Sequence, residues 1–233
     1  MIIRLVTRSS RILLALIFLL WLARLPASAM TAEVHGSHLI LNGPVVEGDW
    51  NTIFQTLESS SAVHTIILRN SSGGHAETGY AVGELIRSRG LRTAVSGFCN
   101  SSCSRMFLGG KERLFTNDPM SRVGFHGHYY ISGPRRGRLN SGLVQRLGLK
   151  NWIIKHSDGK ADPDLVERWI NIPVSNGMIY FFHPVLGMKN GASTFFCEHG
   201  ASRAEIFNCE SISQTALDLG IITSLETIPV RSD

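Results

Sequence analysis

Charge is scarce in this chain, and most of the net charge comes from one short segment. Lys, Arg, Asp and Glu make up 18% of the 233 residues, and the net charge is +5. Residues 1–29 contain no acidic residue, and their four arginines leave the remainder at about +1 (5 − 4). Net charge therefore gives no support for nucleic-acid binding, and we expect no nucleic-acid partner.

Long apolar runs are also lacking, except for one near the N-terminus. The run Ile12 to Ala23 follows three arginines and precedes the small residues Ala27, Ser28 and Ala29. This order is typical of a secretory signal peptide, and it predicts cleavage after Ala29. Twelve apolar residues fall short of the roughly 20 that span a bilayer. We expect a periplasmic or secreted protein with no stable membrane span after signal removal, and an uncleaved membrane anchor is the alternative.

Cysteines are few, and none forms a Cys-x-x-Cys motif. The four are Cys99, Cys103, Cys197 and Cys209. An even number in an exported chain predicts disulfides. Three pairings are open, and the sequence does not decide between them, although pairing of sequence neighbours is favoured. Two free buried thiols are the alternative for Cys99 and Cys103.

Metal and cofactor motifs are absent as well. The spacing of Cys99 and Cys103 differs from that of thioredoxin-like redox sites. A zinc site would have to recruit His126 or His128, and no second ligand pair lies nearby. We expect neither a metal nor a cofactor.

The sequence does contain alternating strand and helix patterns. We expect strands over 38–46, 64–70, 91–97 and 121–126. A helix beginning near Asp49 and a helix over 75–90 lie between them, and a third helix continues through 106–116. This order argues for an α/β fold with parallel pairing.

The C-terminal half is less regular in pattern. Residues 131–142 read as a Gly/Arg-rich loop. Asp162 is expected to cap a helix over 162–170. A β-rich run over 177–187, a helix over 212–220 and a final strand over 221–228 complete the expected elements.

Three short motifs carry the chemistry of a candidate site. Gly73 and Gly74 separate a strand from a helix, where free backbone amides can hold an oxyanion, although a plain tight turn is the commoner explanation. Ser101 and Ser102 lie at the next strand-to-helix turn, and His126 ends a further strand.

These motifs resemble those of the Clp-type serine peptidases within the Clp/crotonase fold. The resemblance covers roughly Leu39 to Tyr129 and rests on "NSSGG", "CNSSC" and "SRVGFH". It is closest to an exported Clp-like branch with a Cys-x-Ser-x-Cys turn. It implies stacked ββα units with mainly parallel strands, in one domain over 30–195 with a C-terminal segment over 196–233.

The resemblance also implies roles for particular residues. Ser101 would be the nucleophile and His126 the general base. The amides of Gly73 or Gly74 and of Ser102 would form the oxyanion hole. The implied substrate is a peptide or ester bond, and the implied assembly is a homo-oligomer.

Several positions depart from the family pattern. Ser72 stands where the family has proline, and His128 lies two residues after His126, so it could replace or assist the base. Asn176, or alternatively Asn208, stands near the place of the acidic third member. Asp162 and Asp164 look like helix-cap residues instead. An incomplete triad leaves a second reading, a non-catalytic Clp-like protein that binds peptides or assists assembly.

The turn around Ser101 carries one geometric expectation. Cys99 and Cys103 should lie close together where the strand passes into the helix, with Cα atoms roughly 4.4–6.8 Å apart. A disulfide there would hold the Ser101 and Ser102 amides in place.

Overall fold

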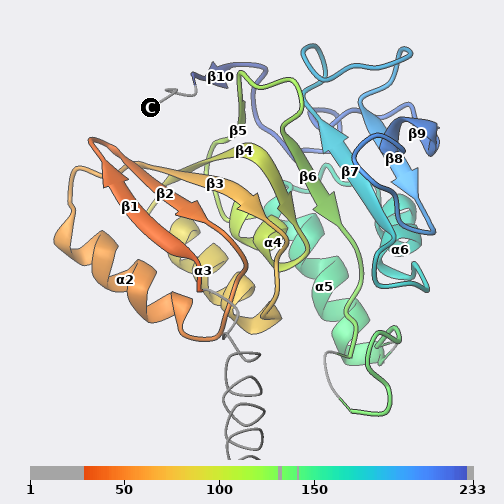
Figure 1. Ribbon diagram of the computed structural model, residues 1–233, viewed down its shortest axis with the longest axis horizontal. Coiled ribbons are helices and arrows are strands. Elements are labelled where there is room, and N and C mark those ends of the chain that lie inside the picture. The colour runs from red at the N-terminus through yellow and green to blue at the C-terminus, as the bar shows by residue number, and fades with distance from the viewer. Residues whose placement is uncertain (1–28, 131–132, 141, 230–233) are drawn as a thin grey trace, which may run out of the picture.

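A single mixed sheet organises the chain in the computed structural model, which describes residues 29–130, 133–140 and 142–229 (Figure 1). The order of its strands is β1-β2-β3-β4-β6-β7-β8-β9, while β5 pairs with β4 and β10. The predicted signal peptide lies outside the described residues, apart from Ala29. Within the described residues, no helix combines the length and the apolar character needed to cross a bilayer.

The centre of the sheet is parallel. β2 (His38–Asn42), β3 (Thr65–Ser71), β4 (Arg92–Asn100) and β6 (Arg122–Phe125) run in the same direction side by side. α2 (Asp49–Ser59) connects β2 to β3, and α3 (Ala76–Ser88) connects β3 to β4. β1 (Thr31–His35) pairs antiparallel with β2 at the edge. Because parallel strands need crossover connections, the alternating pattern of the sequence becomes this architecture.

One edge of β4 pairs with β3, and the other edge pairs with two different strands along its length. Its first part pairs with β5 (Arg113–Thr116), and its last part, from Phe98, pairs with β6. Gly97 lies at the switch with φ +76°, a conformation that suits glycine. The short helix α4 (Ser102–Leu108) follows β4, and β5 pairs in turn with β10 (Thr227–Ile228).

The C-terminal half of the sheet is antiparallel. β7 (Met178–Phe182) pairs with β6 and with β8 (Thr194–Cys197), which pairs with β9 (Glu210–Ile212). The 3-10 turn η1 (Ile206–Asn208) precedes β9. α5 (Leu143–His156) and α6 (Pro163–Ile170) lie between β6 and β7 in the chain and contact each other.

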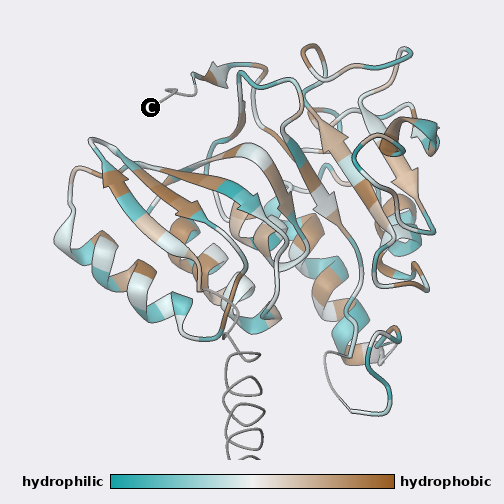
Figure 2. Cartoon of the chain, viewed as in Figure 1, coloured by the Kyte–Doolittle hydropathy of each residue, from teal (hydrophilic) through white to brown (hydrophobic). Residues whose placement is uncertain are grey.

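The main core lies between the sheet and a row of helices in which each contacts the next. In β3, Ile66 and Leu68 face this core, while Ile67 belongs to a smaller cluster with Ala94 and Leu114 on the opposite face. Strand side chains alternate between faces, so both faces of the central strands are apolar. Figure 2 shows the resulting brown stretches on the strands.

Two disulfides join the neighbouring cysteines. Cys99 bonds Cys103 with Cα atoms 5.2 Å apart, and Cys197 bonds Cys209 with Cα atoms 5.1 Å apart. The preferred pairing and the expected geometry at the serine turn are therefore confirmed. The alternative of free thiols is wrong for these residues.

Most of the expected elements before residue 126 are confirmed, with differences at their ends. The strand predicted over 38–46 ends at Asn42, where Gly43 adopts φ +106°. Asp49 lies one residue inside α2, and its carboxylate accepts the Val46 amide at 2.7 Å. The helix predicted to continue through 106–116 is wrong. It ends at Leu108, and the segment Arg113–Thr116 is a strand because it is fully buried beside β4.

The C-terminal predictions are partly wrong. Asp162 caps α6 as expected, with its Oδ1 accepting the Asp164 and Leu165 amides. Residues 215–220 form turns and not a helix, and the final strand is limited to Thr227–Ile228. β1 and α5 have no counterpart among the predicted elements. The domain boundary at 195/196 stays a prediction.

Candidate active site

Three neighbouring parallel strands end at one pocket of about 1170 Å³. β3 is followed by the glycine turn, β4 by Ser101 and β6 by His126. The register places Ser71 opposite Cys99, and Cys99 opposite Val123. Carboxyl ends of parallel strands are the usual place for a ligand site in such sheets. Gly73, Gly74, Ser101 and His126 all line the pocket.

Ser101 forms the sharp turn between β4 and α4. Its backbone has φ 55° and ψ −122°, a conformation that costs energy in a residue with a side chain. Its amide donates to the Gly124 carbonyl at 3.0 Å, and the buried Cys99–Cys103 disulfide spans the turn. A strained strand-to-helix turn of this kind presents a serine side chain to a pocket.

The glycine turn packs directly against Ser101. Gly73 has φ +82°, and a Cβ atom there would lie 2.5 Å from the Asn100 carbonyl oxygen and 2.7 Å from the Ser101 Cβ. Gly74 has φ +146°, and a side chain there would collide with the Val45 carbonyl. Both positions therefore require glycine for close approach as well as for backbone conformation.

The amides around Ser101 differ in their availability. The Gly73 amide donates to Ser71 Oγ at 3.3 Å. The Ser102 amide belongs to the first turn of α4, where amides have no partner within the helix. The amides of Gly74 and Ser102 are consequently the better placed donors for an oxyanion.

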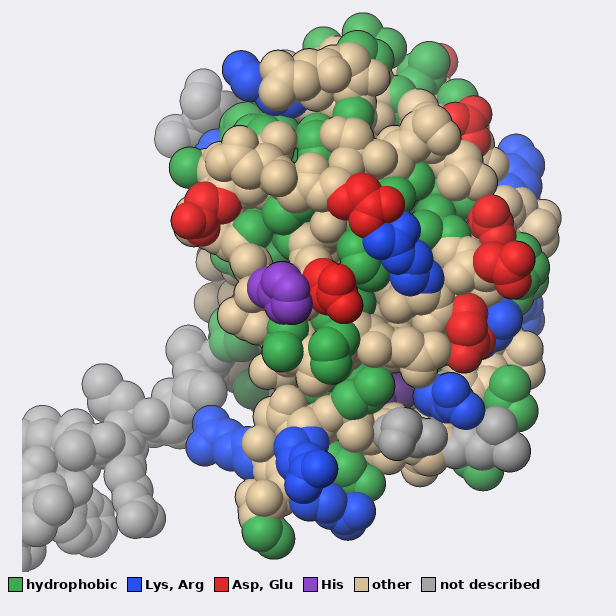
Figure 3. Space-filling model, turned by 90° about the vertical axis from the view of Figure 1, so that its right-hand side faces the viewer, with side chains coloured by type: hydrophobic (Ala, Val, Ile, Leu, Met, Phe, Trp, Pro, Cys, Tyr) green, Lys and Arg blue, Asp and Glu red, His purple; other side chains and the backbone are tan. Residues whose placement is uncertain are grey.

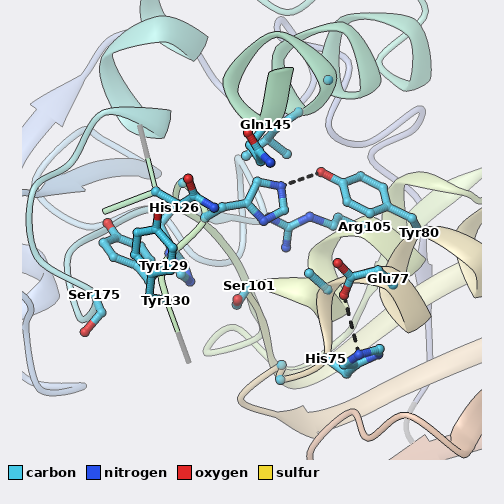
Figure 4. Close-up of a pocket in the computed structure, with 18 of the residues that line it drawn as sticks. His75, Glu77, Tyr80, Ser101, Arg105, His126, Tyr129, Tyr130, Gln145 and Ser175 are labelled. Carbon is cyan, nitrogen blue, oxygen red and sulfur yellow. Dashed lines mark hydrogen bonds and ion pairs between the residues drawn. The ribbon is translucent and has the colours of Figure 1, made fainter. Parts of the chain in front are cut away.

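His126 is a buried, neutral histidine at the end of β6. It is 9% exposed, and its Nδ1 has no hydrogen-bond partner among the described residues. Burial, followed by the positive charge of Arg105 and by His128, lowers its pKa from 6.5 to about 3. No hydrogen bond joins Ser101 and His126 within the described part of the chain, although both face the pocket (Figure 4).

His128 faces a different partner. Its Nε2 lies 2.9 Å from the Tyr80 hydroxyl on α3. Burial, followed by the charge of Arg105, lowers its pKa to about 4. The contact with Tyr80 occupies this ring, so the geometry favours His126 over His128 as the partner of Ser101.

The predicted third member does not meet His126. Asn176 is exposed in the loop before β7 and lies against Gly200, outside the pocket that Ser101 lines. Asn208 is exposed in η1. Asp162 caps α6 and Asp164 lies in its first turn. The structure therefore brings together Ser101, His126 and the glycine turn, but among the described residues no side chain that orients the His126 ring through a hydrogen bond.

Other pocket residues were not foreseen. Arg105 and Tyr80 lie on the wall beside Ser101, and α5 supplies Gln145 and Trp152. Arg105 had a signal in the sequence, because it is the single charged residue of the helix "SCSRMFL". α5 had none, because its apolar residues do not follow a helical stripe. Within the described residues, no group of His, Cys, Asp or Glu side chains has an arrangement that could hold a metal.

Comparison with known proteins shows the fold. ClpP1 from Listeria monocytogenes superposes with a TM-score of 0.52 over 84% of this chain and 93% of its own, at 15% sequence identity. A mutant of the same protein gives a TM-score of 0.50 over the same shares, also at 15% identity. No protein-family model and no curated sequence matches the chain. The protein thus has a Clp-like α/β fold.

Proposed function

We propose that the protein is an exported Clp-like serine hydrolase that cleaves peptide or ester bonds. Ser101 is the nucleophile, His126 the general base, and the amides of Gly73 or Gly74 and of Ser102 form the oxyanion hole. The observation that carries the proposal is the meeting of three strand ends, with a strained serine, a glycine turn and a buried histidine on one pocket.

The reaction would follow the usual course of acyl transfer. Ser101 Oγ attacks the substrate carbonyl carbon while His126 accepts the hydroxyl proton. The carbonyl oxygen becomes an oxyanion that the turn amides stabilise. His126 then gives the proton to the leaving group, and water releases the acyl group from Ser101 by the reverse sequence.

The protonation state of His126 fits the first step better than the second. Its low pKa keeps the ring neutral at physiological pH, so it can accept a proton. Burial and Arg105 disfavour the imidazolium that forms next. A group that stabilises this cation is needed, and Asn176 remains the predicted candidate, which would require the loop before β7 to move.

Export and assembly belong to the same proposal. Two disulfides support maturation in an oxidising compartment, the periplasm or the exterior. Removal of residues 1–29 would release the mature chain, and retention of the segment as an anchor is the alternative. We expect a homo-oligomer, on the strength of the resemblance to Clp-type proteins.

Activity-based labelling tests the proposal. A fluorophosphonate probe should label the mature protein, and mass spectrometry should map the adduct to Ser101. Ser101→Ala should abolish labelling. Ser193→Ala is the matched control, because Ser193 is buried, its hydroxyl has no hydrogen-bond partner among the described residues, and it lies outside the pocket. Equal labelling of the wild type and Ser101→Ala would count against the proposal.

One observation favours a second function, binding without cleavage. His126 Nδ1 has no partner in the described structure, and no hydrogen bond activates Ser101. A protein of this kind would hold an extended peptide in the pocket by backbone pairing and leave it intact. Peptide binding by a wild-type protein that no probe labels would select this alternative.

A further inference from the structure

Arg105 is a buried cation on the wall of the pocket. It lies on α4, one helical turn after Ser101, and is 3% exposed. Its side chain points into the pocket, and its guanidinium carbon lies 5.2 Å from the centre of the Tyr80 ring (Figure 4). Arginines are almost never buried to this degree without a partner.

No counter-charge accompanies Arg105 in the described structure. Its Nε has no hydrogen-bond partner, and none of the ion pairs among these residues includes it. Glu77 is the one acidic residue among those that line the pocket. Its carboxylate is 82% exposed and pairs with His75 Nε2 at 3.5 Å. Arg105 is therefore buried, and no carboxylate of the described residues forms an ion pair with it.

Arg113 shows what a structural arginine in this fold looks like. It is fully buried, and its guanidinium donates to the carbonyl oxygens of Gly110, Gly220 and Ile221 at 2.9–3.2 Å. It also donates to the Asp158 carboxylate at 2.8 Å. Buried charges in native proteins are normally satisfied in this way. The contrast indicates that the partner of Arg105 comes from outside the chain.

The mouth of the pocket is also basic. Arg136 lines it from a loop that carries Arg135 and Arg138, and all three are exposed. Figure 3 shows basic side chains gathered at the lower end of one face of the molecule, where this loop protrudes. Arginines outnumber the one carboxylate, that of Glu77, and this excess of positive charge raises the local concentration of anionic ligands.

We propose that Arg105 binds a carboxylate group of the substrate beside Ser101. The carboxylate belongs either to the C-terminus of a peptide or to an acidic side chain next to the cleaved bond. This inference rests on the proposed function, because it places the reacting carbonyl at Ser101. A guanidinium pairs with a carboxylate through two parallel hydrogen bonds, which gives direction as well as affinity.

Such binding also has a chemical consequence for His126. The charge of Arg105 is one of the causes that lower the pKa of this ring. A carboxylate on Arg105 offsets that charge, so the imidazolium is easier to form when an acidic substrate is present. Substrate recognition and basicity are then coupled through one residue.

Binding to the full mature chain carrying Ser101→Ala tests the inference without hydrolysis. One peptide pair is N-acetyl-trialanine with a free carboxylate and its C-terminal amide. The second pair is N-acetyl-Ala-Glu-Ala-amide and its Gln counterpart. Calorimetry at low salt should show at least about tenfold tighter binding of the acidic member in one pair, and that pair identifies the source of the carboxylate.

Variants of Arg105 decide whether it is responsible. Adding Arg105→Met should remove the discrimination, and Arg105→Lys should keep part of it, because a lysine retains charge but not the two-pronged geometry. Arg203→Met is the matched control, and it should retain the preference because Arg203 is exposed and lies outside the pocket. If Arg105→Met does not fold by circular dichroism, Arg105→Lys alone decides.

Two results would overturn the inference. One is equal affinity within both peptide pairs, and the other is discrimination that survives substitution of Arg105. Labelling of Ser101 in the wild type is a separate measurement. If Ser101 is labelled but no carboxylate preference is found, this inference is wrong and the hydrolase proposal stands. If the preference is found but Ser101 is not labelled, the hydrolase proposal is wrong and Arg105 still binds a carboxylate.

Discussion

The parallel half of the molecule, residues 38–126, differs from the antiparallel half, residues 178–212, in what its strand ends carry. β3, β4 and β6 run in one direction, so the residues that follow them meet at one pocket. β7, β8 and β9 alternate in direction, so successive strand ends lie at opposite edges. Strand direction, more than composition, therefore decides which half can assemble a site.

Each half also has one disulfide, with nearly equal Cα separations. Cys99 and Cys103 are fully buried beneath the turn of Ser101. Cys197 is buried but Cys209 is partly exposed, next to the edge strand β9. The same kind of covalent bond thus spans the Ser101 turn in one half and ties the segment before the edge strand β9 to β8 in the other.

The largest expected effect is on probe labelling, and it compares two glycines with the same φ angle, one in each half. Gly73 and Gly191 both have φ +82°. Alanine at either should cost about 1–2 kcal/mol of stability from the backbone conformation. Gly73→Ala should also reduce probe labelling at least about 100-fold, because the added Cβ would lie 2.7 Å from the Ser101 Cβ and displace an oxyanion donor.

Gly191→Ala controls for the strain. Nothing lies within 4 Å of a Cβ at this position, which is in the loop between β7 and β8. Its labelling rate should match the wild type. If both variants were labelled at similar rates, the close approach of Gly73 to Ser101 would have no role in labelling. The two glycines would then differ only in position.

The next effect is a pH dependence of stability that comes from His126, in the parallel half. The pKa of His126 is about 3 in the folded protein, below the ordinary 6.5, because burial, Arg105 and His128 disfavour its charge. The unfolded chain therefore binds the extra proton, and the stability present above pH 6.5 is lost as pH falls towards 3. At pH 4 the loss should be on the order of 3 kcal/mol.

Urea unfolding at pH 7 and pH 4 measures this loss of stability. His126→Gln lacks the titrating ring, so its free energy of unfolding should fall less between the two pH values than that of the wild type. The remaining groups, including His128, contribute to both proteins and cancel. Amide protection in β6 should fall before that in β8. Equal losses for the two proteins would contradict the assignment of a buried, neutral His126.

Sequence alone predicted the parallel half better than the antiparallel half, for a physical reason. Strand–helix alternation and glycine punctuation are local signals, so the strands before Ser101 and before His126 could be foreseen. The segment Arg113–Thr116 is a strand only because it pairs with β4 and β10, which are distant in sequence. Residues 215–220 have a helical pattern, but the chain turns there, with Asp218 accepting the Thr215 amide at 2.8 Å.

In the candidate site, too, residues marked by local sequence signals were predicted and residues that depend on long-range contacts were not. Ser101, the glycine turn and His126 lie directly after strands, and the motifs located them. A third triad member and Arg105 depend on which side chains converge in space. Asn176 had a suitable place in the sequence but lies outside the pocket. Arg105 was not predicted as a site residue, yet it lines the pocket.

The smallest expected effect compares removal of the two disulfides. In the chain-entropy description, the four-residue separation of Cys99 and Cys103 contributes about 2 kcal/mol and the twelve-residue separation of Cys197 and Cys209 about 3 kcal/mol. We expect the double alanine variant of the first pair to label about tenfold more slowly, because the amides beside Ser101 lose their fixed position. The double variant of the second pair should label within about twofold of the wild type, since it leaves the Ser101 turn untouched.

The labelling rate, compared with the free energy of unfolding of the same variant, should therefore fall further in the first double variant than in the second. The buried position of Cys99 and Cys103 adds a packing loss to their removal, so the ratio of the two measurements is the informative quantity. If both variants lost labelling only in proportion to stability, the disulfide beneath Ser101 would be a structural staple like the other, and packing alone would hold the serine turn.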